Sequence, residues 1–160
     1  MALHRDQPLC FDDLAVGDEW ESPARTVTEA DVVAFAGLSG DFNPIHVDHE
    51  SARAGAFGRP VAHGLLGLAI ASGLGSNSPR VATLAFLAIE GWSFARPIAF
   101  GDTVRVLTRV EAISPKARGR RAEVLWTRRL VNQTGEVVQE GRTRTLVRGR
   151  AADPPAAPTP

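Results

Sequence analysis

The fold is decided by the stretch Gly64-Leu-Leu-Gly-Leu-Ala-Ile-Ala-Ser-Gly-Leu-Gly75, which carries no charged residue. A helix that is apolar on all sides is normally buried on all sides. Its glycines and alanines let neighbouring backbone approach closely. The most apolar run, Leu65 to Leu74, is far shorter than the roughly 20 residues that a membrane-spanning helix needs. We therefore expect a central helix over 64–75 that is enclosed by a sheet.

The sequence after Pro79 supplies the strands for such a sheet. Apolar residues alternate with polar or charged ones, which is typical of strands that have one buried face. Two turn-rich stretches, 115–119 and 132–135, separate these runs. The alternating positions are Val104, Val106, Thr108 and Val110, then Val124, Trp126 and Arg128, then 137–147. A helical first half and an antiparallel second half predict an α+β fold, with one long helix packed in a curled sheet.

The residues before the central helix predict three shorter helical elements. Thr28 is a suitable N-cap for a helix over 28–38, which Ser39-Gly40 ends. Asn43 followed by Pro44 favours a second N-cap with proline at the first helical position. That places His46 at the third position of a short turn. Asp48 is a suitable cap for another short helix, which Gly55 would end.

Length and composition set the outer limits of the prediction. The chain has 160 residues and equal numbers of basic and acidic residues, 18 each. We expect a flexible lead at 1–10, one domain at 11–149 and a disordered Pro/Ala-rich tail at 150–160. A net charge of zero does not favour nucleic acid as a ligand. Cys10 is the only cysteine, and residues 1–6 lack the apolar core of a signal peptide, so we expect a cytoplasmic protein that is not bound to a membrane.

Asp41 and His46 are the most specific candidates for an acid–base pair in the sequence. One local turn holds both, and a carboxylate beside an imidazole can share the proton transfers of adding water to an α,β-unsaturated acyl thioester. Such a reaction also needs a donor for the oxygen that becomes enolate-like. Gly64 begins the central helix, where backbone N–H groups lack intrahelical partners. Its N–H is our candidate oxyanion donor.

The residues alone leave alternatives to a catalytic site open. Asp41 could simply cap the next turn, and His46 could be a hydrogen-bonded structural histidine. A metal site is a weaker alternative, because no familiar zinc spacing occurs; its ligands would be His46, Asp48, His49 and His63. The basic cluster Lys116-Ala-Arg118-Gly-Arg-Arg121 is either a solvated hairpin tip or a contact for an anionic ligand such as a nucleotide phosphate.

Taken together, four segments resemble the MaoC-like dehydratase family, the (R)-specific enoyl-CoA hydratases of the hot-dog fold. The resemblance covers about residues 11 to 148. The segments are Phe35-Ala-Gly-Leu-Ser-Gly-Asp41-Phe-Asn43-Pro44-Ile-His46-Val-Asp48, Phe57-Gly-Arg59-Pro-Val-Ala-His63-Gly64, Trp92-Ser-Phe-Ala-Arg96-Pro97 with Gly101-Asp-Thr103, and Asn132-Gln-Thr-Gly-Glu136.

The resemblance implies roles for individual residues. Asp41 and His46 would activate water, and Gly64 would bind the thioester oxygen, with Asn43, His63 and Ser72 in support. It implies an acyl-CoA or acyl-carrier-protein substrate, no cofactor and no metal, and a homodimer with joined sheets. Arg25, Arg59 and Arg96, together with Lys116 and Arg118, are further candidates to bind the substrate. A hot-dog thioesterase and a non-catalytic acyl-thioester-binding module remain as alternatives.

Overall fold

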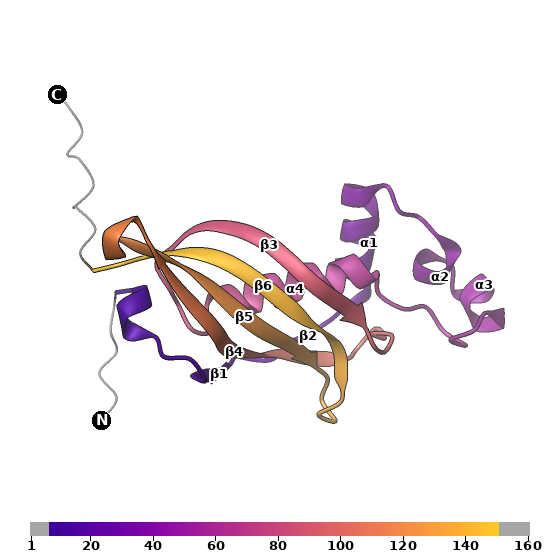
Figure 1. The fold of residues 1–160 in the computed structure, drawn as a ribbon. Coiled ribbons are helices and arrows are strands. Elements are labelled where there is room, and N and C mark those ends of the chain that lie inside the picture. The colour runs from indigo at the N-terminus through magenta and orange to yellow at the C-terminus, as the bar shows by residue number, and fades with distance from the viewer. Residues whose placement is uncertain (1–6, 151–160) are drawn as a thin grey trace.

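One antiparallel sheet forms the body of the molecule in the computed structural model, which describes residues 7–150. Its strand order is β1-β4-β5-β6-β3, and β2 pairs with β4 beside β1. The long strands curl around one helix, α4 (Figure 1). The strands are β1 (Glu19–Glu21), β2 (Arg25–Thr26), β3 (Thr83–Phe94), β4 (Thr103–Lys116), β5 (Arg121–Val131) and β6 (Val137–Arg148). This is the α+β hot-dog arrangement that the sequence predicted.

The core lies between α4 (Gly64–Ser76) and the inner face of the sheet. Alternate residues of β4 and β5 point inward, as the sequence periodicity predicted. Leu66 and Ile70 of α4 pack against fully buried Val104, Val106 and Leu130. A second cluster around Trp126 fills the other end of the sheet. Burying such side chains stabilises the fold by roughly 1.5–3 kcal/mol each, so the sheet and α4 depend on each other.

The expectation that α4 is buried on every side is wrong for the single chain. Leu65 is 60% exposed, and Ala69 and Gly73 lie on the same exposed face. The sheet encloses one side of the helix and leaves this stripe uncovered. The neighbouring edge strand β3 also exposes Leu84, Phe86, Leu87 and Ile89. Apolar groups gathered at a free strand edge are typical of a surface that another chain covers.

Three helices lie to one side of the sheet (Figure 1). They are α1 (Glu29–Ser39), α2 (Pro44–Val47) and α3 (His49–Ala54). The predicted caps are present: the Thr28 side chain accepts a hydrogen bond from the Asp31 N–H, and the Asp48 side chain accepts from two N–H groups of α3. These hydrogen bonds satisfy N–H groups at the starts of α1 and α3. The two capped helices flank α2 and so help to hold this single turn in place.

The described residues also refine the predicted domain limits. Leu9 forms a bridge with Val81, and its N–H donates to the Arg80 carbonyl oxygen at 2.9 Å. The domain therefore reaches back into the expected lead. Two short 3-10 turns, η1 (Phe11–Asp13) and η2 (Ala117–Gly119), complete the fold. Arg150, the first residue of the expected tail, is bound to the domain, because its N–H donates to the Asp12 carboxylate at 2.9 Å. The rest of that tail, 151–160, and the first part of the lead, 1–6, lie outside the described residues. No helix within 7–150 is long and apolar enough to cross a membrane.

Candidate active site

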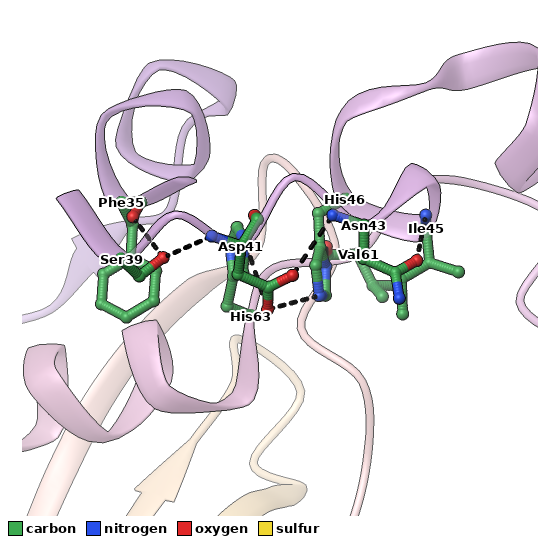
Figure 2. A network of polar contacts seen from close by, with 8 residues as sticks. All are labelled: Phe35, Ser39, Asp41, Asn43, Ile45, His46, Val61 and His63. Atoms are coloured by element: carbon green, nitrogen blue, oxygen red, sulfur yellow. Dashed lines mark hydrogen bonds and ion pairs between the residues drawn. The ribbon is translucent and has the colours of Figure 1, made fainter. Parts of the chain in front are cut away.

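The loop between α1 and α2 positions Asp41 through its own backbone. Gly40 ends α1 with φ at +78°, a left-handed conformation that glycine adopts without strain. The chain then turns so that the Asp41 N–H donates to the Ser39 Oγ at 3.2 Å. The Asn43 N–H in turn donates to the Asp41 Oδ1 at 3.2 Å. These contacts, drawn in Figure 2, fix the direction of the Asp41 carboxylate.

The helix α2 presents His46 and determines which ring nitrogen is free. The Asn43 Oδ1 accepts from the Ile45 N–H at 3.2 Å, and Pro44 is the first helical residue, as predicted. The His46 Nδ1 lies 2.7 Å from the Val61 carbonyl oxygen. Because a carbonyl only accepts, Nδ1 carries the hydrogen, and the neutral ring keeps its lone pair on Nε2. His46 is thereby prepared to accept a proton at Nε2.

That free nitrogen faces the Asp41 carboxylate. The distance from His46 Nε2 to Asp41 Oδ2 is 4.0 Å, too long for a direct hydrogen bond but suited to one bridging water molecule. The Asp41 side chain is about half exposed, whereas that of His46 is largely buried. The pair therefore joins a solvent-accessible carboxylate to an oriented imidazole, which are the two groups that water activation requires.

His63 supports this pair from the residue before α4. Its Nε2 lies 2.9 Å from the Asp41 carbonyl oxygen, so it donates there. Its ring stacks on that of His46, with the centroids 3.8 Å apart. The side chain is almost fully buried. His63 therefore ties the Asp41 loop to the start of α4 and limits how far the His46 ring can move.

Gly64 is the first residue of α4, so its N–H has no intrahelical partner. Its carbonyl oxygen accepts from the Gln139 Nε2 at 3.0 Å, and Gln139 also accepts from the Trp92 Nε1 at 3.1 Å. A Cβ on residue 64 would lie 3.0 Å from the Phe94 ring. Gly64 and His46 line one pocket of about 330 Å³ together with Phe94 and other residues, so a carbonyl oxygen placed there can lie near both.

Asp41, His46 and His63 also offer three possible metal ligands within 4.8 Å of one another. The His63 Nε2 already donates to a carbonyl oxygen and would have to lose that hydrogen and bond in order to bind a metal. The Asp41 carboxylate and the His46 Nε2 stay available without the loss of that bond, and the His63 Nδ1 is buried without a hydrogen-bond partner among residues 7–150. Proton transfer needs only the first two groups, whereas a zinc site needs three or four ligands.

Of the other residues that the sequence predicted for the site, Arg96 lines the pocket and Arg25, Arg59 and Ser72 do not. Arg96 lines the pocket of His46 and Gly64 and forms an ion pair of 3.4 Å with Glu136. Arg25 pairs with Asp31 at the start of α1, which is a structural contact. Arg59 is exposed on the segment before α4. Ser72 lies along α4, in a second pocket that does not include His46.

The basic hairpin tip is far from this site. Lys116 and Arg118 belong to the β4–β5 turn, at the end of the sheet opposite α1–α3 (Figure 1). Lys116 pairs with Glu123 at 3.6 Å. Within one chain these residues therefore do not approach Asp41 and His46. A larger cavity of about 640 Å³ beside β1 also contains none of the predicted site residues.

Sequence reasoning missed two residues that contact the candidate site, Val61 and Gln139, and one buried cation further along α4, Arg128. Val61 acts through its carbonyl oxygen, which no side-chain pattern reveals. Gln139 and Arg128 lie on inward-facing positions of β6 and β5 and are 2% and 6% exposed. One pattern could have indicated Arg128: a charged residue continues the alternate, inward-facing apolar positions Val124 and Trp126 along the same strand.

Comparisons with known proteins match this sequence and fold. A family model described as MaoC like domain matches residues 13–132. An (R)-specific enoyl-CoA hydratase of Rhodospirillum rubrum is 32% identical over 141 residues, which cover 88% of this chain and 92% of that protein. The crystal structure of the MaoC-like dehydratase from the same organism superposes with a TM-score of 0.79 at 36% identity, covering 89% of this chain and 98% of that chain. Protein MaoC of Klebsiella aerogenes is 38% identical over 96 residues, 60% of this chain, but the match spans only 29% of that longer protein.

Proposed function

The chain belongs to the MaoC-like family, and from this premise we propose that it is a hydro-lyase for α,β-unsaturated acyl thioesters. It would add water to an enoyl-CoA or enoyl-carrier-protein thioester to give the (R)-3-hydroxyacyl thioester, or catalyse the reverse dehydration. The observation that carries the proposal is the pairing of the Asp41 Oδ2 with a His46 Nε2 whose tautomer is fixed by the Val61 carbonyl oxygen.

The addition would begin with one water molecule between these two atoms. Water donates one hydrogen to His46 Nε2 and the other to Asp41 Oδ2, which leaves its oxygen lone pairs directed at Cβ. As the carbon–oxygen bond forms, His46 takes the proton, and negative charge moves through Cα to the thioester oxygen. The imidazolium gains stabilisation from the Asp41 carboxylate. It then returns a proton to Cα from the same side, which gives syn addition.

The Gly64 N–H would stabilise the thioester oxygen while it carries negative charge. The N-terminus of α4 adds the positive end of the helix dipole. A donor of this kind contributes roughly 3–4 kcal/mol to the transition state. Gln139, which itself accepts from the Trp92 Nε1, holds the Gly64 carbonyl group and so helps to fix the first turn of α4. These steps need no group beyond the named residues and water, so we propose catalysis without a cofactor.

We also propose that two copies associate through β3. The strand is a free edge of the sheet, and its exposed apolar side chains lie next to the exposed stripe of α4. A second β3 would satisfy the unpaired edge and cover both surfaces. Light scattering on Leu87→Lys, with Val16→Lys at the opposite edge as control, tests this arrangement. The first variant should dissociate into monomers and the second should not; dimers of unchanged stability in both would contradict it.

One assay tests the reaction itself. The protein is mixed with crotonyl-CoA while the conjugated enoyl absorbance and the release of free thiol are followed together. A hydratase removes the absorbance without releasing thiol. Thiol release would instead identify a thioesterase, and no change in either signal would identify a binding module.

A further inference from the structure

A second pocket of about 330 Å³ lies between α4 and the sheet. Its lining combines the partly exposed face of α4 with Phe86, Ile89 and Trp92 of β3, and Arg128 of β5 also lines it. The α4 residues that line it, Leu65 to Ser72, continue along the helix from Gly64. The two pockets share no lining residue, so an acyl chain whose thioester oxygen is bound at Gly64 would pass Leu65 and Leu68 of α4 to enter this second pocket.

Arg128 is an unusual residue to find on this path. Its side chain is 6% exposed, and its Nε has no hydrogen-bond partner among residues 7–150. Burial alone lowers the pKa of the guanidinium, to about 10, so the group is still charged at neutral pH. A buried charge without a partner costs several kcal/mol, and such a group calls for a counter-charge that arrives from elsewhere.

The neighbours of Arg128 are also incompletely satisfied. Thr108 lies directly across from Arg128 in the β4–β5 register, and Thr143 lines the same pocket on β6. Five buried side-chain nitrogen or oxygen atoms lack a hydrogen-bond partner within the described part of the chain. Three of them are the Arg128 Nε and the hydroxyls of Thr108 and Thr143. The guanidinium and the two hydroxyls therefore have donor hydrogens to spare and no anionic group among them.

The end of α4 is shaped around this guanidinium. A Cβ on Gly75 would lie 2.8 Å from the Arg128 Nη1, so the glycine leaves the space that the arginine occupies. The C-terminal end of α4 carries partial negative charge, which helps to retain the cation. It does not provide the missing hydrogen bond. By helix rise, Gly75 lies about 16 Å from Gly64, which sets the length of chain that reaches Arg128.

We propose that Arg128 binds a carboxylate at the far end of the acyl chain, so that the preferred substrates are thioesters of dicarboxylic acids of medium length. This inference rests on the proposed function for the position of the thioester. A carboxylate accepts two parallel hydrogen bonds from a guanidinium, and its remaining lone pairs suit the Thr143 hydroxyl. In the proposed dimer a second copy would cover the exposed apolar wall of the pocket, exclude water from the pair and so strengthen it.

Binding of saturated thioesters tests the proposal independently of catalysis. Adipyl-, suberyl- and sebacyl-CoA are compared by calorimetry with their methyl-ended counterparts hexanoyl-, octanoyl- and decanoyl-CoA. For at least one length, wild type should bind the carboxylated thioester about 10- to 100-fold more tightly, as expected for a buried charged hydrogen bond. Equal or weaker binding at all three lengths would overturn the proposal.

Three variants locate the effect. Arg128→Met should abolish the preference and improve binding of the methyl-ended thioester, whereas Arg129→Met, at the exposed neighbouring position, should retain it. Arg128→Lys keeps the charge without the two parallel bonds and should retain a reduced preference. An unchanged preference in Arg128→Met would show that Arg128 is only a structural cation at the end of α4. If the wild-type protein showed this binding preference but did not hydrate crotonyl-CoA, the proposed function would be contradicted and this inference would stand.

Discussion

The two ends of α4 differ in how their polar side chains are bonded. At the N-terminal end, Asn43 and Val61 orient the side chains of Asp41 and His46. Towards the C-terminal end, the Arg128 Nε and the Thr143 Oγ1 have no hydrogen-bond partner within residues 7–150. The first region is therefore organised before any substrate arrives, which suits proton transfer. The second carries a buried cation and a hydroxyl that make no hydrogen bond, which suits recognition of an anionic group that the substrate brings. One helix thus joins the proposed reaction centre to the proposed carboxylate site.

The largest effect should follow from removing a member of the organised pair. His46→Ala and Asp41→Asn should each lower the rate of enoyl-CoA hydration by about 100- to 10,000-fold, because each removes a group that handles the transferred proton. Circular dichroism should show an unchanged fold. His49→Ala is a matched control, since His49 is exposed and pairs with Glu29. Activity close to wild type in either site variant would remove that residue from the mechanism.

Gly64 allows the oxyanion donor to be separated from its surroundings. His63 already has φ and ψ of −57° and 136°, which suit a residue before proline, and proline is accepted at the first helical position. Gly64→Pro therefore removes the N–H, and Gly64→Ala controls for crowding of the Phe94 ring. Proline should lower kcat/KM by about 100- to 1,000-fold more than alanine. If the two variants have equal rates, the N–H is not the donor.

The incomplete region makes the opposite prediction for stability. Replacing a buried, unpaired cation by an apolar side chain of similar length should raise the free energy of unfolding of Arg128→Met by about 1–4 kcal/mol. Arg129→Met should differ from wild type by no more than about 0.5 kcal/mol. Urea unfolding of the proteins without ligand measures both. A destabilised Arg128→Met would mean that the arginine contributes to the folded state itself, which contradicts the contrast between the two ends of α4.

The smallest effect concerns the helix that leads into the reaction centre. Hydrogen bonding, first from the Thr28 N–H, lowers the pKa of Asp31 in the folded protein. The stability that the Asp31 carboxylate contributes is therefore present above its pKa in the unfolded state, and it is lost as the pH falls through its pKa in the folded state. Asp31→Asn should cost about 1 kcal/mol at neutral pH. The difference from wild type should vanish in acid; a difference that persists at low pH would show that the cap does not depend on the charge.

The same contrast explains how much the sequence could predict. The caps at Thr28, Asn43 and Asp48, the turn that holds Asp41 and His46, and the start of α4 at Gly64 are local features, so spacing along the chain predicts them. The proximity of Arg128 to Gly75 and Thr143 brings together β5, α4 and β6, and no local pattern describes it. The exposed face of α4 was missed for a similar reason, because an apolar helix does not reveal whether its own chain or a second copy covers it.

The central claim is that Asp41 and His46 add water across the double bond from one side. Hydration of crotonyl-CoA in heavy water, followed by NMR and chiral analysis of the product, tests it most directly. The account predicts (R)-3-hydroxybutyryl-CoA with deuterium at Cα on the same face as the new hydroxyl group, and no such product from His46→Ala. The (S) product, anti addition or free thiol without hydration would contradict it.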